Sequence, residues 1–237
     1  MQNCRRKTMM LRLFFDNTIL FSHLTQVFVA GGSKGVGRET VASLIDAGKS
    51  VVAMVRTEEA KKDLESIGAT AIIGDAMVYK NVEDSMWGCD AAVTTLGGVT
   101  DGKRVDYDGN RNVVEAAGIL GVTRLVYVTS IGCGDSKEAL SDETYEVLKD
   151  ALQAKEKVET QLEKFYKFSC DYTVIRPGGL ITAPATGKAE LTEDTTTSGV
   201  IHRADVASLI LDVLDDEKTI KKTFTAVDPT ASVPSKE

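Results

Sequence analysis

Short apolar runs alternate with amphipathic stretches from residue 26 to the C-terminal part of the chain. Each run is rich in β-branched residues and nearly free of charge, as expected for strands that are covered on both faces. The predicted strands lie at residues 26–30, 50–55, 69–73, 91–95, 125–129, 172–175 and 224–227. Apolar residues recur at helical spacing between these runs, and Gly48 and Gly121 mark the ends of two predicted helices.

This alternation predicts the fold class. A repeated strand–helix–strand pattern gives a parallel sheet with right-handed crossovers and helices on both faces. The chain shows no internal repeat or boundary after residue 26. We therefore predict a single α/β domain over residues 26–237, with a three-layer, doubly wound parallel sheet. Only one further strand is expected after Gly178.

Residues 1–25 differ from the rest of the chain in charge. They contain four basic residues and one acidic residue, a net charge of +3, whereas the whole chain carries −7, which leaves −10 for the remainder. We therefore predict that residues 1–25 form an N-terminal extension, either a loosely attached leader or a targeting peptide. Polar residues interrupt its uncharged part, so no transmembrane segment is expected.

The composition narrows the function classes. Charged residues make up 27% and hydrophobic residues 43% of the chain, which is typical of a soluble globular protein. The acidic balance argues against a general nucleic-acid binder, which needs a basic surface. The four cysteines form no CxxC pair and only two histidines are present. We therefore expect reduced thiols, an intracellular compartment and no metal site.

A glycine-rich segment directly follows the first predicted strand and opens the first predicted helix. Glycines permit a tight turn there and let the backbone approach a pyrophosphate, while the helix N-terminus offers free N–H groups to phosphates. The alternative is an ordinary tight turn between a strand and a helix. In this position the pattern predicts a dinucleotide-binding site. Its residues are Gly31, Gly32, Ser33, Lys34, Gly35, Val36 and Gly37.

The end of the second predicted strand indicates which dinucleotide binds. NAD sites usually carry an acidic residue there for the ribose 2′-hydroxyl, but this chain has Arg56. Arg56 and Lys34 together favour a 2′-phosphate, and hence NADP(H), with NAD(H) as the alternative cofactor. Alternatively, both are solvated surface cations. Asp75, which precedes Ala76 after the third strand, is a candidate for adenine binding or for a helix N-cap.

These segments resemble the short-chain dehydrogenase/reductase superfamily, in particular the atypical NAD(P)-binding branch that includes flavin/biliverdin reductase-like and plastid Tic62-like proteins. The resemblance extends over residues 26–228 and rests on residues 31–37, 74–75, 95–98, 128–132, 155–159 and 174–179. It implies a Rossmann fold and further cofactor contacts near the ribose and the nicotinamide. The residues it adds are Thr95, Leu96, Gly97, Thr129, Pro177, Gly178 and Gly179.

The resemblance leaves the catalytic residues in two alternative registers. Active superfamily members use a serine after the fifth strand, which Ser130 matches, and a YxxxK pair on the next helix. Tyr145 and Lys149 fit that pair literally, and their spacing puts both on one helical face. The KxKxE pattern of the atypical branch instead matches residues 155–159. In that register Lys155 is the lysine, and Ala151 occupies the position of the tyrosine.

Two function classes follow from these features. The first is an NADP(H)-dependent oxidoreductase that reduces a small planar or carbonyl acceptor, which the sequence does not identify. The second is an NADP(H)-binding scaffold or redox sensor that docks on a protein partner. An epimerase or dehydratase ranks third, because such enzymes usually keep the tyrosine and add a larger C-terminal region. We expect an intracellular, soluble protein of the plastid or cytoplasm, with a pocket lid in residues 179–197.

Overall fold

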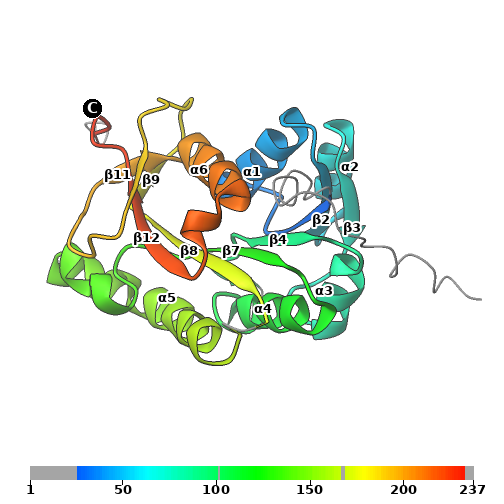
Figure 1. The fold of residues 1–237 in the computed structure, drawn as a ribbon, viewed down its shortest axis with the longest axis horizontal. Helices are drawn as coiled ribbons and strands as arrows, with labels where there is room; N and C mark the ends of the chain where they lie inside the picture. Colours follow the sequence, from blue (N-terminus) through cyan, green and yellow to red (C-terminus); the bar gives the residue numbers. More distant parts are fainter. Residues whose placement is uncertain (1–25, 101, 167–168, 233–237) are drawn as a thin grey trace, which may run out of the picture.

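The computed structural model describes residues 26–100, 102–166 and 169–232, and these form an α/β domain around an eight-stranded sheet (Figure 1). The order of the strands across the sheet is β10-β12-β8-β7-β4-β1-β2-β3. The sheet strands are β1 (Gln26–Ala30), β2 (Ser50–Val55), β3 (Thr70–Ile73), β4 (Ala91–Thr94), β7 (Arg124–Val128), β8 (Asp171–Pro177), β10 (Glu190–Thr192) and β12 (Lys222–Val227). The N-terminal extension predicted for residues 1–25 lies outside the described residues and stays a prediction.

Helices cover both faces of the sheet, as the alternating pattern predicts. The α-helices are α1 (Gly35–Asp46), α2 (Glu58–Ser66), α3 (Tyr79–Met86), α4 (Asp108–Leu120), α5 (Asp142–Gln161) and α6 (Arg203–Asp215). Apolar residues of α1, α2 and α6 pack in one core on the first face, and those of α3, α4 and α5 pack in a second core on the other face. Figure 1 shows α1 and α6 on the opposite side of the sheet from α4 and α5.

Local signals set several helix boundaries. The Thr57 hydroxyl accepts a hydrogen bond from the Ala60 amide at the start of α2, and Ser141 caps α5 in the same way through the Thr144 amide. Gly121 ends α4 in the left-handed conformation, with φ of 72°. These residues fix where the helices begin and end, and therefore which side chains reach the loops at the edge of the sheet.

The region after Pro177 contains more strands than the single one expected from the sequence. It forms β9 (Gly179–Ile181), β10, β11 (Val200–His202) and β12. β10 pairs antiparallel with β12 at the edge of the sheet, so the sheet is mostly, rather than wholly, parallel. β9, β10 and β11 have three residues each, too few to give a recognisable apolar run. A second pair of short strands, β5 (Val99–Thr100) and β6 (Lys103–Arg104), forms a hairpin after β4.

The topology determines where a ligand can bind. The parallel strands end at the same edge of the sheet, and the strand order reverses between β1 and β4. In open α/β sheets, ligands occupy the crevice at this switch point, beyond the carboxyl ends of the strands. The loops that follow β1, β2, β3, β4, β7 and β8 all meet there, although they come from distant parts of the chain.

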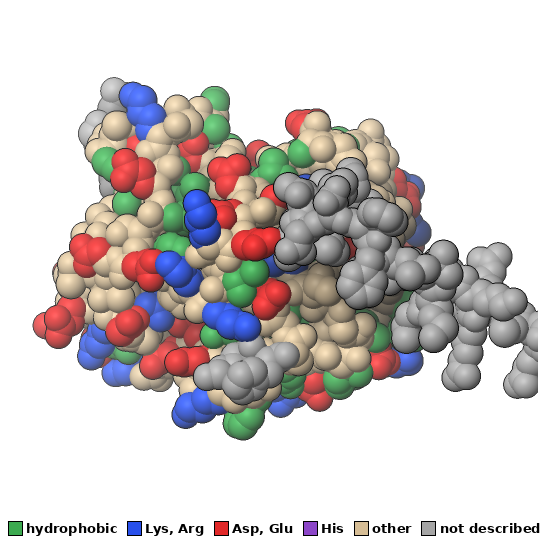
Figure 2. Space-filling model, viewed as in Figure 1, with side chains coloured by type: hydrophobic (Ala, Val, Ile, Leu, Met, Phe, Trp, Pro, Cys, Tyr) green, Lys and Arg blue, Asp and Glu red, His purple; other side chains and the backbone are tan. Residues whose placement is uncertain are grey.

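The surface view shows acidic and basic side chains interspersed over one face of the molecule (Figure 2). The described residues on this face therefore form no broad basic patch of the type that binds nucleic-acid phosphates. Among the described residues, none of the helices combines the length and apolar character that crossing a membrane requires.

Candidate cofactor and active site

A large cavity lies at this switch point of the sheet, with a volume of about 1090 Å³. Its walls come from the glycine-rich turn, the carboxyl ends of the central strands, α5 and the start of α6. Fifteen of the predicted site residues line it: Gly31, Ser33, Lys34, Gly35, Val36, Arg56, Asp75, Ala76, Thr95, Leu96, Gly97, Thr129, Ser130, Lys155 and Pro177. Residues from seven separate segments of the sequence thus share one cavity.

The glycine-rich turn is too tight for larger side chains. Gly31 has φ of 89°, and a Cβ atom there would lie 2.7 Å from the Thr95 hydroxyl oxygen. A Cβ atom on Gly37 would overlap the carbonyl oxygen of Gly31. Gly37 is buried behind the turn and holds α1 against it. The glycines therefore leave room for the backbone of the turn to approach a ligand closely, as a pyrophosphate requires.

The start of α1 suits an anionic ligand. Lys34 occupies the N-cap position without a side-chain cap, and the first turn of α1 contains no acidic residue. The first amide groups of a helix have no partner within it, so they can donate to phosphate oxygens. The turn and the helix N-terminus therefore fit the pyrophosphate of a dinucleotide.

Three cations line the cavity near the glycine-rich turn and the end of β2. Lys34 and Arg56 line it, and in the described part of the chain neither forms an ion pair with a carboxylate. The third is Arg38, which the sequence analysis did not select although it directly follows the last glycine of the turn. Its Nε donates to Asp63 Oδ2 at 2.8 Å. Lys34 and Arg56 are thus free to pair with an anion.

Asp75 lines the cavity and does not cap the next helix. Its Oδ1 accepts a hydrogen bond from the Met77 amide at 2.9 Å, and its own amide donates to Asn81 Oδ1. The N-cap position of α3 belongs to Val78. Asp75 is therefore not the N-cap of α3, and adenine binding stays a prediction.

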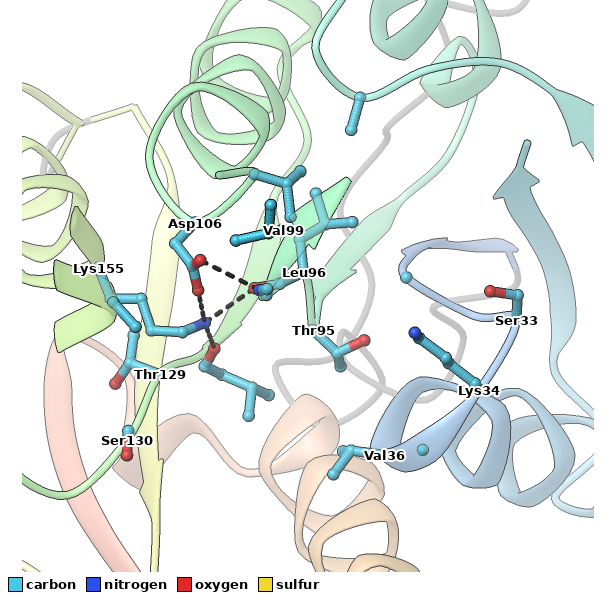
Figure 3. A pocket seen from close by; sticks show the side chains of 18 of the residues that line it. Ser33, Lys34, Val36, Thr95, Leu96, Val99, Asp106, Thr129, Ser130 and Lys155 are labelled. Atoms are coloured by element: carbon cyan, nitrogen blue, oxygen red, sulfur yellow. Dashed lines mark hydrogen bonds and ion pairs between the residues drawn. The ribbon is translucent and has the colours of Figure 1, made fainter. Parts of the chain in front are cut away.

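The opposite wall of the cavity contains a buried ion pair. Lys155 Nζ lies 3.6 Å from Asp106 Oδ1 and donates to the Leu96 carbonyl oxygen at 2.8 Å. Figure 3 shows this pair across the cavity from Ser33 and Lys34. The Lys155 side chain is 11% exposed and that of Asp106 1%. Burial lowers the pKa of Lys155, and the Asp106 carboxylate offsets part of that shift.

Asp106 organises the loop beside this pair. Its Oδ2 accepts hydrogen bonds from the Gly98 amide and from Arg104 Nη1, both at 3.1 Å. Residue 97 must be small to let the loop approach the Asp106 carboxylate, because a Cβ atom on Gly97 would lie 3.2 Å from Asp106 Oδ1. The carboxylate thus joins the β5–β6 hairpin to Lys155. Asp106 was not predicted from the sequence, because no motif or strand end marks this acidic residue.

The structure does not bring the Tyr145–Lys149 pair to the cavity. Tyr145 is 8% exposed and packs against Cys133, Leu140 and Leu152. Lys149 pairs with Glu146 on the surface at 3.0 Å. Ala151 and Lys155 do line the cavity, four residues apart on α5. The face of α5 that meets the cavity is therefore the one predicted by the KxKxE register.

The remaining predicted residues divide into two groups. Ser130 lies in the cavity wall, where its hydroxyl donates to the Ile131 carbonyl oxygen at 2.9 Å. Gly32, Gly37, Gly178 and Gly179 do not line the cavity. The amides of Gly178 and Gly179 donate to the carbonyl oxygens of Ala226 and Gly199. These two glycines therefore hold the segment after Pro177 against β12 and β11, and Pro177 alone of the three reaches the cavity.

The thiols are poor nucleophiles. Burial raises the pKa of Cys89 to about 11 and that of both Cys133 and Cys170 to about 12. Cys4 lies outside the described residues.

His202, Asp205 and Asp228 form a small polar cluster near the start of α6. His202 occupies the N-cap position, and its Nδ1 lies 3.6 Å from Asp205 Oδ2. Both carboxylates also contact the Thr186 hydroxyl. Because these contacts join the loop at Thr186 to α6, we interpret the cluster as a structural tie.

Comparison with known proteins decides the family. Residues 31–217 match the model of a family described as NAD(P)H-binding. The chain belongs to this family. The match includes the glycine-rich turn and most of the cavity wall, and it confirms the predicted nicotinamide-cofactor fold and the resemblance to atypical short-chain dehydrogenases/reductases.

This NAD(P)H-binding protein is similar in sequence to proteins whose names indicate different functions. It is 33% identical over 207 residues to the uncharacterized sugar epimerase YhfK of Bacillus subtilis, which covers 84% of this chain and 92% of that protein. It is 29% identical over 214 residues to the chloroplastic protein TIC 62 of Pisum sativum, covering 78% of this chain but 39% of that protein. Relatives in plastids therefore exist.

At least one solved structure matches the fold of this chain closely. The anaerobillin reductase ChuY from Escherichia coli O157:H7 superposes with a TM-score of 0.80 at 29% identity, covering 88% of this chain and all of that one. The NAD(P)H-binding fold thus spans the described domain, and its relatives include proteins named as reductases and as epimerases.

Proposed function

We propose that this chain is an NADPH-dependent reductase that acts on a small planar or carbonyl acceptor. The observation that carries the proposal is the division of the cavity into two chemically different ends. One end has Lys34 and Arg56, which lack carboxylate partners among the described residues. The other end has Lys155 and apolar side chains. A bound nicotinamide cofactor supplies a hydride in such a site.

The apolar end suits a flat acceptor. Val99, Leu148 and Leu180 line the cavity from β5, α5 and β9, and all three remain exposed. Exposed apolar side chains that line one cavity indicate a surface for an apolar ligand. Binding there would exclude water from the reacting atoms and orient the acceptor.

Lys155 supplies the polar group at this end. Its ammonium is held by the Leu96 carbonyl and the Asp106 carboxylate. Its third contact, to the Val128 carbonyl oxygen, is long at 3.5 Å, so a ribose hydroxyl or an acceptor oxygen can replace that carbonyl as the acceptor of the third proton. We assign Lys155 the orienting role that the superfamily gives to the YxxxK lysine. No tyrosine lines the cavity in the described ranges, so the proton for the acceptor would come from solvent or from Lys155.

The missing tyrosine also favours a second candidate function. A chain that binds NADP(H) and catalyses slowly, or not at all, would serve as a scaffold or redox sensor on a protein partner. The same feature argues against an epimerase, which usually needs that tyrosine.

Turnover separates the two functions. The purified protein is incubated with NADPH and a panel of quinones, flavins and carbonyl compounds, and NADPH oxidation is followed by absorbance. We expect acceptor-dependent oxidation. NADPH binding with no oxidation across the panel would favour the scaffold, and no binding would reject both.

Substitutions on α5 test which register is catalytic. Tyr145→Phe removes a hydroxyl that lies outside the cavity, so we expect kcat within about twofold of wild type. Lys155→Met removes the orienting ammonium and should lower kcat/KM by about 100-fold, the lower range for a positioned proton-transfer group. The opposite pattern would restore the Tyr145–Lys149 pair as the catalytic one.

Arg56→Ala tests cofactor preference. We expect it to weaken NADPH binding by about 1–3 kcal/mol and leave NADH binding nearly unchanged, since only NADPH has the 2′-phosphate. Fluorescence titration measures both dissociation constants. Lys61→Ala is the matched control, because Lys61 pairs with Glu65 on α2 and does not line the cavity. Equal losses for NADPH and NADH would contradict the NADP(H) assignment.

A further inference from the structure

The cavity has a further cation at the start of α6. Arg203 is the first residue of α6, and it lines the cavity. It is distant in sequence from the glycine-rich turn, but α6 packs directly against α1. Figure 3 shows this arrangement, with α6 in pale orange beside the helix that follows Ser33 and Lys34.

The guanidinium of Arg203 lies against the glycine-rich turn. Its Nε is 3.7 Å from the position that a Cβ atom on Gly35 would take, and Cδ is 3.9 Å from it. Gly35 is the first residue of α1, where the unpaired helix amides begin. Any side chain at residue 35 would fill the space between this guanidinium and the turn. The open space at Gly35 therefore has a positive charge on its far side.

The protein fixes Arg203 without neutralising it. Nη1 donates to the Leu180 carbonyl oxygen at 3.2 Å and to the Thr182 hydroxyl at 2.7 Å. Both partners are neutral, and no described carboxylate lies within ion-pair distance of Arg203. Arg38 and Lys155, by contrast, each have an aspartate partner. A preorganised guanidinium with no counter-ion is the usual arrangement for binding a phosphate.

We infer that Arg203 binds the pyrophosphate of the cofactor from the side opposite the α1 N-terminus. This inference rests on the proposed cofactor site. A pyrophosphate at the turn would accept from the α1 amides on one side and from the guanidinium on the other. Because Nη1 is bonded to Leu180 and Thr182, the contact also links the cofactor to β9, whose Leu180 belongs to the apolar acceptor end.

The test compares ligands with and without the pyrophosphate. NADPH and NADH both contain it, whereas 2′-AMP contains adenosine and a 2′-phosphate but lacks the pyrophosphate and the nicotinamide riboside. Arg203→Gln should therefore raise the dissociation constants of NADPH and NADH by the same factor, about tenfold or more, and leave 2′-AMP unchanged. Arg56→Ala should do the reverse, weakening NADPH and 2′-AMP but not NADH. Calorimetry measures the dissociation constant of 2′-AMP, and nucleotide fluorescence measures those of NADPH and NADH.

Two further variants separate binding from folding. Arg203→Lys keeps the charge but loses the fork geometry, so its loss should be smaller than that of Arg203→Gln. Arg111→Gln is the matched control, since Arg111 lies on α4 outside the cavity wall, and it should bind all three ligands as wild type does.

The binding measurements distinguish failure of the inference from failure of the proposed function. Unchanged NADPH and NADH binding by Arg203→Gln would overturn the inference while leaving the proposed function intact. A parallel loss of 2′-AMP binding would show that Arg203 only supports the fold around the site. Failure of the wild-type protein to bind NADPH would instead reject the proposed function.

Discussion

Replacing Gly37 with alanine is expected to weaken NADPH binding by about 100-fold. The new Cβ atom would overlap the Gly31 carbonyl oxygen and lie 2.6 Å from the Thr95 hydroxyl oxygen. The Gly31 backbone cannot move aside as a flexible side chain could, so α1 must move away from the turn. Overpacking of this kind costs about 1–3 kcal/mol, and here the displaced groups are those that form the phosphate site.

The control for this substitution lies on the same helix. Ser43→Ala changes a partly exposed residue of α1 that does not line the cavity, so we expect wild-type binding. Fluorescence titration with NADPH measures affinity, and thermal unfolding measures stability for both variants. A Gly37→Ala protein that binds NADPH within threefold of wild type would contradict the assignment of the turn as the phosphate site.

Replacing Asp106 with asparagine is expected to destabilise the fold by about 3–5 kcal/mol at neutral pH, because it leaves the buried Lys155 without its counter-ion. The variant would also loosen the β5–β6 hairpin, since Arg104 loses its carboxylate partner. Equilibrium unfolding in urea measures the change. Lys155→Met combined with Asp106→Asn removes both charges, so the double variant should recover most of the lost stability.

The loss should depend on pH with a defined sign. Burial already holds the pKa of Lys155 below its unfolded value, so between the two values the unfolded chain binds more protons and stability rises with pH. Without Asp106 the pKa of Lys155 in the folded state falls further. The pH range over which stability rises therefore extends to lower pH. The destabilisation of Asp106→Asn relative to wild type should therefore shrink as the pH rises to about 10, near the unfolded lysine value. An equal loss at neutral and high pH would contradict the ion-pair account.

The strands and the phosphate turn were predictable because their signals are local. Each central strand is a continuous apolar run, and the turn at Gly31 needs several glycines within a few residues. The short strands β9, β10 and β11 give no such signal, because their pairing depends on chain segments far away. The sequence pattern therefore predicts the central strands of the sheet but not the short strands near the C-terminus of the chain.

The candidate site was predictable only in part for the same reason. Lys155 and Tyr145 lie on one helix, and the sequence left two registers open because it does not state which face meets the cavity. Tertiary contacts choose that face: Lys155 bonds to Leu96, which lies 59 positions away. Asp106 and Arg203 join the site through equally distant contacts, so no local pattern marks them.

A crystal structure with bound NADP(H) tests the central claim most directly. The account predicts that the pyrophosphate lies on the α1 N-terminus and that Lys155 and Ala151 lie beside the nicotinamide, with Tyr145 still packed against Cys133 and Leu152. A structure in which the Tyr145 hydroxyl approaches the nicotinamide and Lys149 bonds to its ribose would contradict the account.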